Sequence, residues 1–67
     1  MMKICDFVER ELEYFRKQCN FTDDEREYFE LKAKGKSNVQ ISMIMNVSEN
    51  TVVNIGRKVK KKIIKVL

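Results

Sequence analysis

The chain has 67 residues and a formal net charge of +4, from 14 Lys and Arg against 10 Asp and Glu, which suits one small domain over residues 1–67. It has no histidine for acid–base or metal chemistry, two cysteines are too few for a zinc site, and two glycines cannot build a phosphate-binding loop. No apolar run approaches the ~18 residues of a membrane span. From these observations together we expect a cytoplasmic, non-enzymatic protein with no cofactor, no metal and no membrane contact.

The charge is divided unevenly along the chain. Residues 1–30 carry five basic and nine acidic side chains, whereas residues 31–67 carry nine basic side chains and a single acidic one, Glu49. The net charges of the two parts are therefore −4 and +8. Such asymmetry favours a polyanionic partner, with nucleic acid first and a membrane surface second.

The first predicted element is an amphipathic helix over residues 3–19, within an N-terminal part that covers residues 1–20. Its apolar residues recur at alternating steps of three and four, which places them on one stripe: Cys5, Val8, Leu12, Phe15 and Cys19. Within one helix the two cysteines would lie ~21 Å apart, too far for a disulfide. Asn20 is the expected helix end. The stripe either packs on the rest of the domain or pairs two chains as a short coiled-coil seam.

Two capping boxes mark the next helix starts. Thr22-Asp23-Asp24-Glu25 combines an N-cap hydroxyl with a carboxylate three residues later, and Ser37-Asn38-Val39-Gln40 repeats the pattern with an amide. They predict helices over about residues 23–34 and 38–45, separated by Gly35, which suits a left-handed helix end. The residues expected to face the core are Tyr28, Phe29 and Leu31 in the first helix and Ile41, Ile44 and Met45 in the second.

The last predicted helix is long and basic. Asn46 can supply a positive-φ turn and Ser48 an N-cap, so that a helix follows over about residues 49–66. Gly56 stands inside this helix, although glycine costs ~1 kcal/mol there relative to alanine. Close approach of another helix, close approach of a DNA backbone and a local kink would each explain it. The expected inward stripe is Val52, Ile55, Val59, Ile63 and Val66.

The two helices on either side of Asn46 form a predicted helix-turn-helix. A small residue, Ser42, follows the inward-facing Ile41 where the two helices cross. Apolar residues fix both sides of the turn and face inward from the second helix: Met45, Val47, Val52 and Ile55. The predicted fold is therefore an all-α domain of four helices, with no wing, in which residues 21–67 form the helix-turn-helix core. An ordinary helical hairpin is the alternative.

Three segments carry a family resemblance: Phe21-Thr22-x-x-Glu25, Ala33-x-Gly35-x-Ser37-Asn38-x-x-Ile41 and Val47-Ser48-x-x-Thr51-Val52. Together they resemble the DNA-binding domain of LuxR/GerE-type regulators, and they are also similar to region four of bacterial sigma factors. LuxR-type domains usually have a histidine where this chain has Ile55 and a further helix after the recognition helix. This chain has no histidine, and no further helix is expected. The helix that precedes the three-helix unit and the long, basic recognition helix are more like the sigma region. The resemblance implies a DNA-binding transcription regulator of bacterial, phage or mobile-element origin.

The resemblance also implies which residues meet DNA. The N-terminal part of the last helix would lie in the major groove of double-stranded DNA, with Asn54 suited to adenine, Arg57 to guanine and Val53 to a thymine methyl. The expected base-reading residues are Asn50, Val53, Asn54 and Arg57. Phosphate contacts are expected at two helix N-termini and along the lysine run: Lys36, Asn38, Ser48, Thr51, Lys58, Lys61 and Lys62.

Two other functions remain open from the sequence. A sigma-like adaptor would bind RNA polymerase or another protein through the acidic N-terminal helix, and a sequence-independent DNA binder would use the lysines alone. The sequence also leaves open a homodimer formed through the N-terminal helix. A lone helix-turn-helix reads few base pairs, and dimers read two half-sites.

Overall fold

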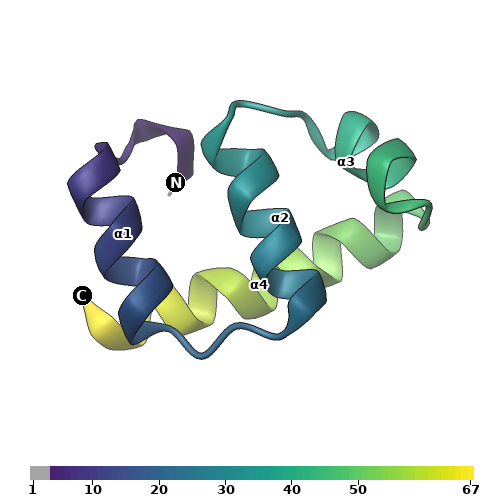
Figure 1. Ribbon diagram of the computed structural model, residues 1–67. Helices are drawn as coiled ribbons and strands as arrows, with labels where there is room; N and C mark the ends of the chain where they lie inside the picture. Colours follow the sequence, from purple (N-terminus) through teal and green to yellow (C-terminus); the bar gives the residue numbers. More distant parts are fainter. Residues whose placement is uncertain (1–3) are drawn as a thin grey trace.

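The computed structural model describes residues 4–67, apart from the side chain of Cys5, and within this range it contains helices and no strand. A short 3₁₀ helix, η1 (Ile4–Asp6), precedes α1 (Glu9–Gln18), α2 (Asp23–Ala33), α3 (Asn38–Met45) and α4 (Glu49–Val66). The long helix α4 runs along the molecule, with α1 near its C-terminal end, α2 across its middle and α3 near its start (Figure 1). The predicted all-α, four-helix fold is confirmed.

The capping boxes of α2 and α3 are formed as predicted. The backbone N–H of Glu25 donates to Thr22 Oγ1 at 3.3 Å, and the backbone N–H of Thr22 donates to Glu25 Oε1 at 3.0 Å. Ser37 and Gln40 make the same reciprocal pair at 3.2 and 2.9 Å. Because both boxes use residues only three positions apart, they set the starts of these helices locally.

The turn of the helix-turn-helix also follows the prediction. Asn46 ends α3 in the left-handed conformation, with φ 58° and ψ 47°. Ser48 then accepts a hydrogen bond from the backbone N–H of Thr51 at 3.2 Å, which caps the start of α4. Gly35, in the loop between α2 and α3, has φ 86°, a value that favours glycine.

The N-terminal helix is shorter than predicted, and the expectation of one helix over residues 3–19 is wrong. Val8 is extended, with φ −76° and ψ 162°, and separates η1 from α1. Its backbone N–H donates to Glu11 Oε1 at 3.0 Å, so that Glu11 caps the start of α1. The Val8 side chain is 57% exposed and does not belong to the buried stripe.

The C-terminal end of α1 also differs from the prediction. The helix ends at Gln18, and Cys19 follows as an extended C-cap with φ −85° and ψ 132°. Asn20 is therefore not a left-handed helix end. Cys19 is a buried free thiol whose pKa is raised by burial, an effect that the nearby Lys62 charge opposes. The predicted positions of Lys3 and of the Cys5 side chain lie outside the described part of the chain.

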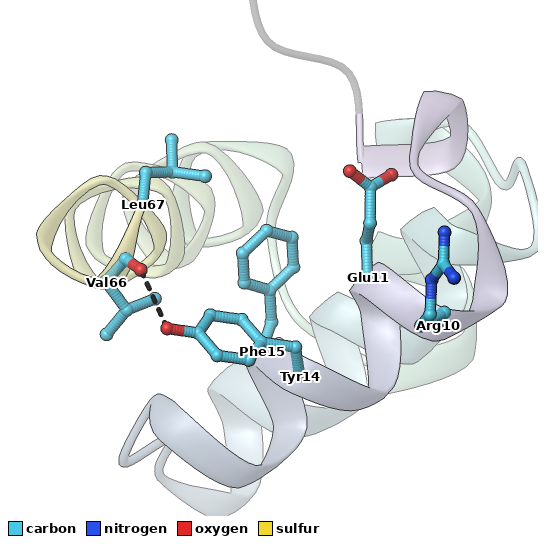
Figure 2. A pocket seen from close by; sticks show the side chains of 6 residues that line it. All are labelled: Arg10, Glu11, Tyr14, Phe15, Val66 and Leu67. Atoms are coloured by element: carbon cyan, nitrogen blue, oxygen red, sulfur yellow. Dashed lines mark hydrogen bonds between the residues drawn. The ribbon is translucent and has the colours of Figure 1, made fainter.

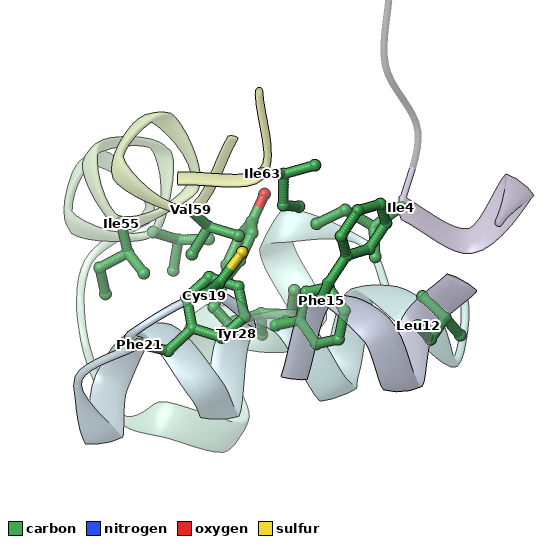
Figure 3. Close-up of a cluster of buried hydrophobic side chains, with 12 residues drawn as sticks. Ile4, Leu12, Phe15, Cys19, Phe21, Tyr28, Ile55, Val59 and Ile63 are labelled. Atoms are coloured by element: carbon green, nitrogen blue, oxygen red, sulfur yellow. The ribbon is translucent and has the colours of Figure 1, made fainter. Parts of the chain in front are cut away.

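One hydrophobic core joins η1, α1, α2, α3 and α4 (Figure 3). Aromatic rings form its centre, where Phe29 meets Phe15 edge-on at 6.5 Å and Phe21 at 5.1 Å between ring centroids. The predicted inward stripe of α4 is buried, except that Val66 at the end is only partly covered. The fully buried side chains are Phe29, Ile41, Val52, Val59 and Ile63.

The prediction that Ile44 faces the core is wrong. Its side chain is 50% exposed, whereas Ile41 of the same helix is fully buried and Met45 is partly buried. The reason is that α3 has only eight residues and packs mainly against α4. A helix that touches one neighbour buries a narrow stripe and leaves the adjacent apolar side chain in solvent.

Gly56 is explained by close approach of another helix. A Cβ atom at this position would lie 2.5 Å from Oη and 2.8 Å from Cζ of Tyr28, which comes from α2. Gly56 is itself buried, so contact with a DNA backbone does not account for it. Residue 56 must therefore be small for α2 and α4 to pack at this distance.

An arginine joins α1 to α2. The Arg16 guanidinium donates to both carboxylate oxygens of Glu30, at 2.6 and 2.9 Å, and to Glu9 at 3.0 Å. It also lies 5.9 Å from the ring centroid of Phe29. The hydrogen bonds to Glu30, and to a smaller extent the hydrogen bond to Glu9, raise the pKa of Arg16, so its guanidinium group stays charged. The two-point contact with Glu30 fixes geometry as well as charge.

Candidate nucleic-acid interface

The first half of α4 presents the four expected base-reading residues on one exposed face. At 3.6 residues per turn they fall within an arc of about 100°, and the opposite arc holds buried Val52 and Ile55. No other residue of the described chain forms a hydrogen bond or ion pair with the polar side chains of this face. The face therefore offers free donors and acceptors on a helix that is fixed from behind. Its members are Asn50, Val53, Asn54 and Arg57.

The start of α4 combines hydroxyl groups with free backbone donors. Ser48 Oγ and Thr51 Oγ1 lie 2.9 Å apart in a hydrogen bond, and both residues are exposed. The unpaired N–H groups of the first turn and the helix dipole favour an anion there. The geometry suits a phosphate oxygen at the edge of the groove that α4 would enter.

The expected phosphate contacts at the start of α3 are less open. Lys36 and Asn38 are both partly buried, and Asn38 Oδ1 is buried with no hydrogen-bond partner in the described chain. An amide oxygen in this position cannot bind phosphate, because phosphate oxygens accept hydrogen bonds. Any contact of Asn38 with DNA would therefore use its amide nitrogen.

The lysines of α4 do not all lie on one side. Lys58 and Lys61 are exposed, in line with the base-reading face, and Lys65 continues the same side one turn later. Lys65 belongs to the same lysine run, for which the sequence predicts phosphate contact.

Lys62 is placed differently from the other predicted phosphate contacts. Its ammonium group forms an ion pair with the Glu25 carboxylate and donates a hydrogen bond to the backbone carbonyl of Asn20 at 2.7 Å. The Glu25 residue is only 5% exposed. The charge of Lys62 is thus neutralised inside the domain, at the start of α2. Sequence reasoning assigned Glu25 to capping alone and missed this second partner 37 positions away.

The surroundings of Glu25 control its ionisation. Burial alone would raise the pKa of this carboxyl group, but the hydrogen bond and charge of Lys62 and the hydrogen bonds from Thr22 outweigh burial. The net result is a pKa below the ordinary value of 4.5. The folded domain therefore favours the ionised form of Glu25 over the protonated form more strongly than the unfolded chain does.

This lowered pKa predicts a specific acid sensitivity. A depressed carboxyl pKa contributes stability that is fully present above the unfolded value of 4.5 and is lost as the pH falls through the folded value. We expect the unfolding free energy of the wild type to drop more steeply than that of Glu25→Gln below about pH 4.5. Urea unfolding of both proteins between about pH 7 and pH 3 measures this difference. Parallel pH profiles would show that Glu25 titrates alike in both states.

A shallow apolar groove lies between α1 and the end of α4 (Figure 2). Its volume is about 360 Å³, and the Tyr14 hydroxyl crosses it to donate to the Val66 carbonyl at 3.1 Å. Leu67 at its edge is 75% exposed. The lining residues are Arg10, Glu11, Tyr14, Phe15, Val66 and Leu67.

No group of three or more His, Cys, Asp or Glu side chains within residues 4–67 is arranged to hold a metal ion. None of the helices described is both long enough and apolar enough to cross a membrane.

Comparison with known families decides the affiliation. The model of the bacterial regulatory proteins of the luxR family, GerE, matches residues 19–64. The chain belongs to this family. A search of curated proteins and a search of solved structures gave no match. The LuxR/GerE resemblance inferred from the three sequence segments is thereby confirmed.

The match locates the LuxR-family domain on the structure. Residues 19–64 contain α2, α3 and nearly all of α4, whereas η1 and α1 precede them. The family is one of DNA-binding transcription regulators, and the matched residues contain the helix-turn-helix of α3 and α4. Ile55, at the position where LuxR-type domains usually have histidine, lies in the core of this domain.

Proposed function

We propose that this LuxR-family domain binds double-stranded DNA sequence-specifically and that α4 reads the major groove. The observation that carries the proposal is the two-sided character of α4: one face is buried in the core, while the opposite face of its first half holds exposed, unpaired polar side chains. A helix fixed from behind can present such side chains to base edges.

The chemistry of the exposed face suits particular bases. Arg57 can donate two hydrogen bonds to O6 and N7 of guanine, and the Asn54 amide can pair with N6 and N7 of adenine. Val53 can contact the methyl group of thymine, and Asn50 lies one turn before Asn54 on the same side. These four residues are the proposed specificity determinants.

Phosphate contacts would fix the domain on the duplex. Ser48 and Thr51 hold one backbone position at the start of α4, and Lys36 and Asn38 hold another at the start of α3. Lys58 and Lys61 extend the contact along α4. Lys62 is left out of the proposed interface because its ammonium group is bound to Glu25.

Replacement of Arg57 by alanine tests base reading. We expect the variant to lose about 1–3 kcal/mol of discrimination at one base pair, because that is the value of a bidentate contact to guanine. Sites selected from random duplexes by the wild type and by Arg57→Ala would differ in preference at a single position. Lys61→Ala is the matched control and should weaken binding to all duplexes alike. If Arg57→Ala also lost affinity uniformly, Arg57 would be a phosphate contact.

A homodimer through α1 is the second part of the proposal. Tyr14 and Leu67, which line the groove between α1 and α4, are 48% and 75% exposed, which favours association there. The same selection experiment reports the oligomeric state, since a dimer on DNA yields two half-sites about 34–36 Å apart. A single short site would indicate a monomer.

The setting proposed for this function is the cytoplasm of a bacterium, with the gene on the chromosome, a phage or a mobile element. The adaptor function makes a different prediction for the same material. A domain that selects no DNA sequence yet stays bound to RNA polymerase after nuclease treatment of the extract would favour the adaptor.

A further inference from the structure

Two directional contacts join α2 to α4. At the first, the Tyr28 ring occupies the space that a side chain at Gly56 would need. At the second, Glu25 and Asn20 hold the Lys62 ammonium group. The two points lie six residues apart on α4, or about 9 Å along the helix.

The first contact favours one register. Gly56 is the single residue of α4 without a Cβ atom, and the Tyr28 ring lies in the space that a Cβ atom there would fill. Apolar packing elsewhere in the core is non-directional and tolerates small adjustments of angle. The glycine contact therefore restricts sliding of α4 along α2.

The second contact restricts rotation. Lys62 is bound from two directions, by the side chain of Glu25 and by the backbone carbonyl of Asn20. Glu25 is in turn fixed by its capping bond with the Thr22 backbone at 3.0 Å. Charge-assisted hydrogen bonds of this kind are shorter and stronger than neutral ones. The contact therefore favours the rotation of α4 at which the Lys62 ammonium group reaches both acceptors.

Rotation of α4 matters for any base contact. Arg57 follows Gly56 directly, and a side chain about 6 Å from the helix axis moves by about 1 Å for every 10° of rotation. Binding constellations lose their function beyond errors of about 0.5 Å or 10–20°. We propose that Glu25 and Tyr28 are positioning residues that hold α4 at the rotation and register at which Asn54 and Arg57 meet base edges. This assignment rests on the proposed DNA-reading function.

The test uses two substitutions that change the charge in opposite directions. Glu25→Gln raises the net charge of the domain by one, and Lys62→Met lowers it by one. Long-range electrostatics therefore predicts opposite effects of the two substitutions on affinity for any duplex. Positioning predicts the same effect from both: the ratio of affinities for the selected site and for a random duplex falls about tenfold or more. The double variant should fall no further than the single variants, because both substitutions break one contact.

Leu12→Ala in α1 is the control for stability. It removes a buried side chain that makes no contact with the exposed face of α4 in its first half, and it should leave the affinity ratio unchanged at a temperature at which circular dichroism shows the protein folded. If a single variant is unfolded there, the double variant, which leaves no unpaired buried charge, supplies the measurement. Unchanged ratios in folded variants, or opposite changes in the two single variants, would overturn the positioning role.

A different experimental result would contradict the proposed DNA-reading function. A wild-type domain that selects no sequence at all would contradict base reading itself. A wild type that selects a clear motif, with variants that keep its preference, would contradict only the positioning role of Glu25.

Discussion

Replacement of Gly56 by alanine should lower the free energy of unfolding by about 1–3 kcal/mol, the usual cost of overpacking a core. Alanine favours helix over glycine by ~1 kcal/mol, so a free helix would gain stability from the same change. Here the new Cβ would meet Tyr28 Oη at 2.5 Å and Cζ at 2.8 Å. Tyr28 is 2% exposed, and its ring cannot move away without disturbing its neighbours. In a domain of this size each kcal/mol shifts Tm by about 4–8 °C.

A double-mutant cycle identifies the cause of this loss. Tyr28→Phe removes Oη, the atom nearest to the added Cβ, so Gly56→Ala should cost less in that background. Gly35→Ala is the matched control, because no atom lies within 4 Å of its Cβ position and its cost comes only from φ 86°. That cost should not depend on residue 28. A Gly56→Ala variant that is more stable than the wild type would show that Tyr28 or the two helices shift to make room for the added Cβ atom, and it would contradict the predicted overpacking.

DNA affinity should fall about 40-fold when the salt concentration is raised fourfold. This value follows if Lys36, Lys58 and Lys61 neutralise one phosphate each, because the logarithmic slope is then about −2.7. Titrations of a labelled duplex at several salt concentrations measure the slope directly. Replacing one of these lysines, for example by Lys61→Ala, should make the slope less steep by about 0.9.

Lys62→Met is the internal control for the salt experiment. Its ammonium group is bound to Glu25 and Asn20, so the variant should keep the wild-type salt slope even where its affinity for the selected site is reduced. If Lys62→Met changed the slope as much as Lys61→Ala does, Lys62 would release Glu25 and contact phosphate on DNA.

Local signals account for the parts of the fold that the sequence predicted well. The starts of α2 and α3 depend on capping pairs three residues apart, and the turn depends on Asn46 and the Ser48 cap, so each can be read from a few neighbouring residues. The start of α1 was missed because its cap residue, Val8, has no polar side chain, and Glu11 supplies only the bond to its backbone.

Contacts between distant residues account for the parts that could not be predicted. The Cβ space at Gly56 is taken by Tyr28, 28 positions earlier, and the partner of Lys62 is Glu25. Neither pair follows a helix or strand repeat along the sequence, because both contacts depend on how α2 lies against α4. The outward face of α4 was predictable for the opposite reason, because the apolar stripe alone determines which side chains point away.

The 18 residues of α4 extend about 27 Å, close to the longest dimension of the molecule, 29 Å. One helix thus forms the long axis of the core and, in the proposed function, also carries the base-reading side chains, with the two roles on opposite faces. None of the four side chains Asn50, Val53, Asn54 and Arg57 is buried, so we expect substitutions there to have little effect on folding. Under the proposed function, single substitutions on this face would change the recognised DNA sequence while the core stays as it is.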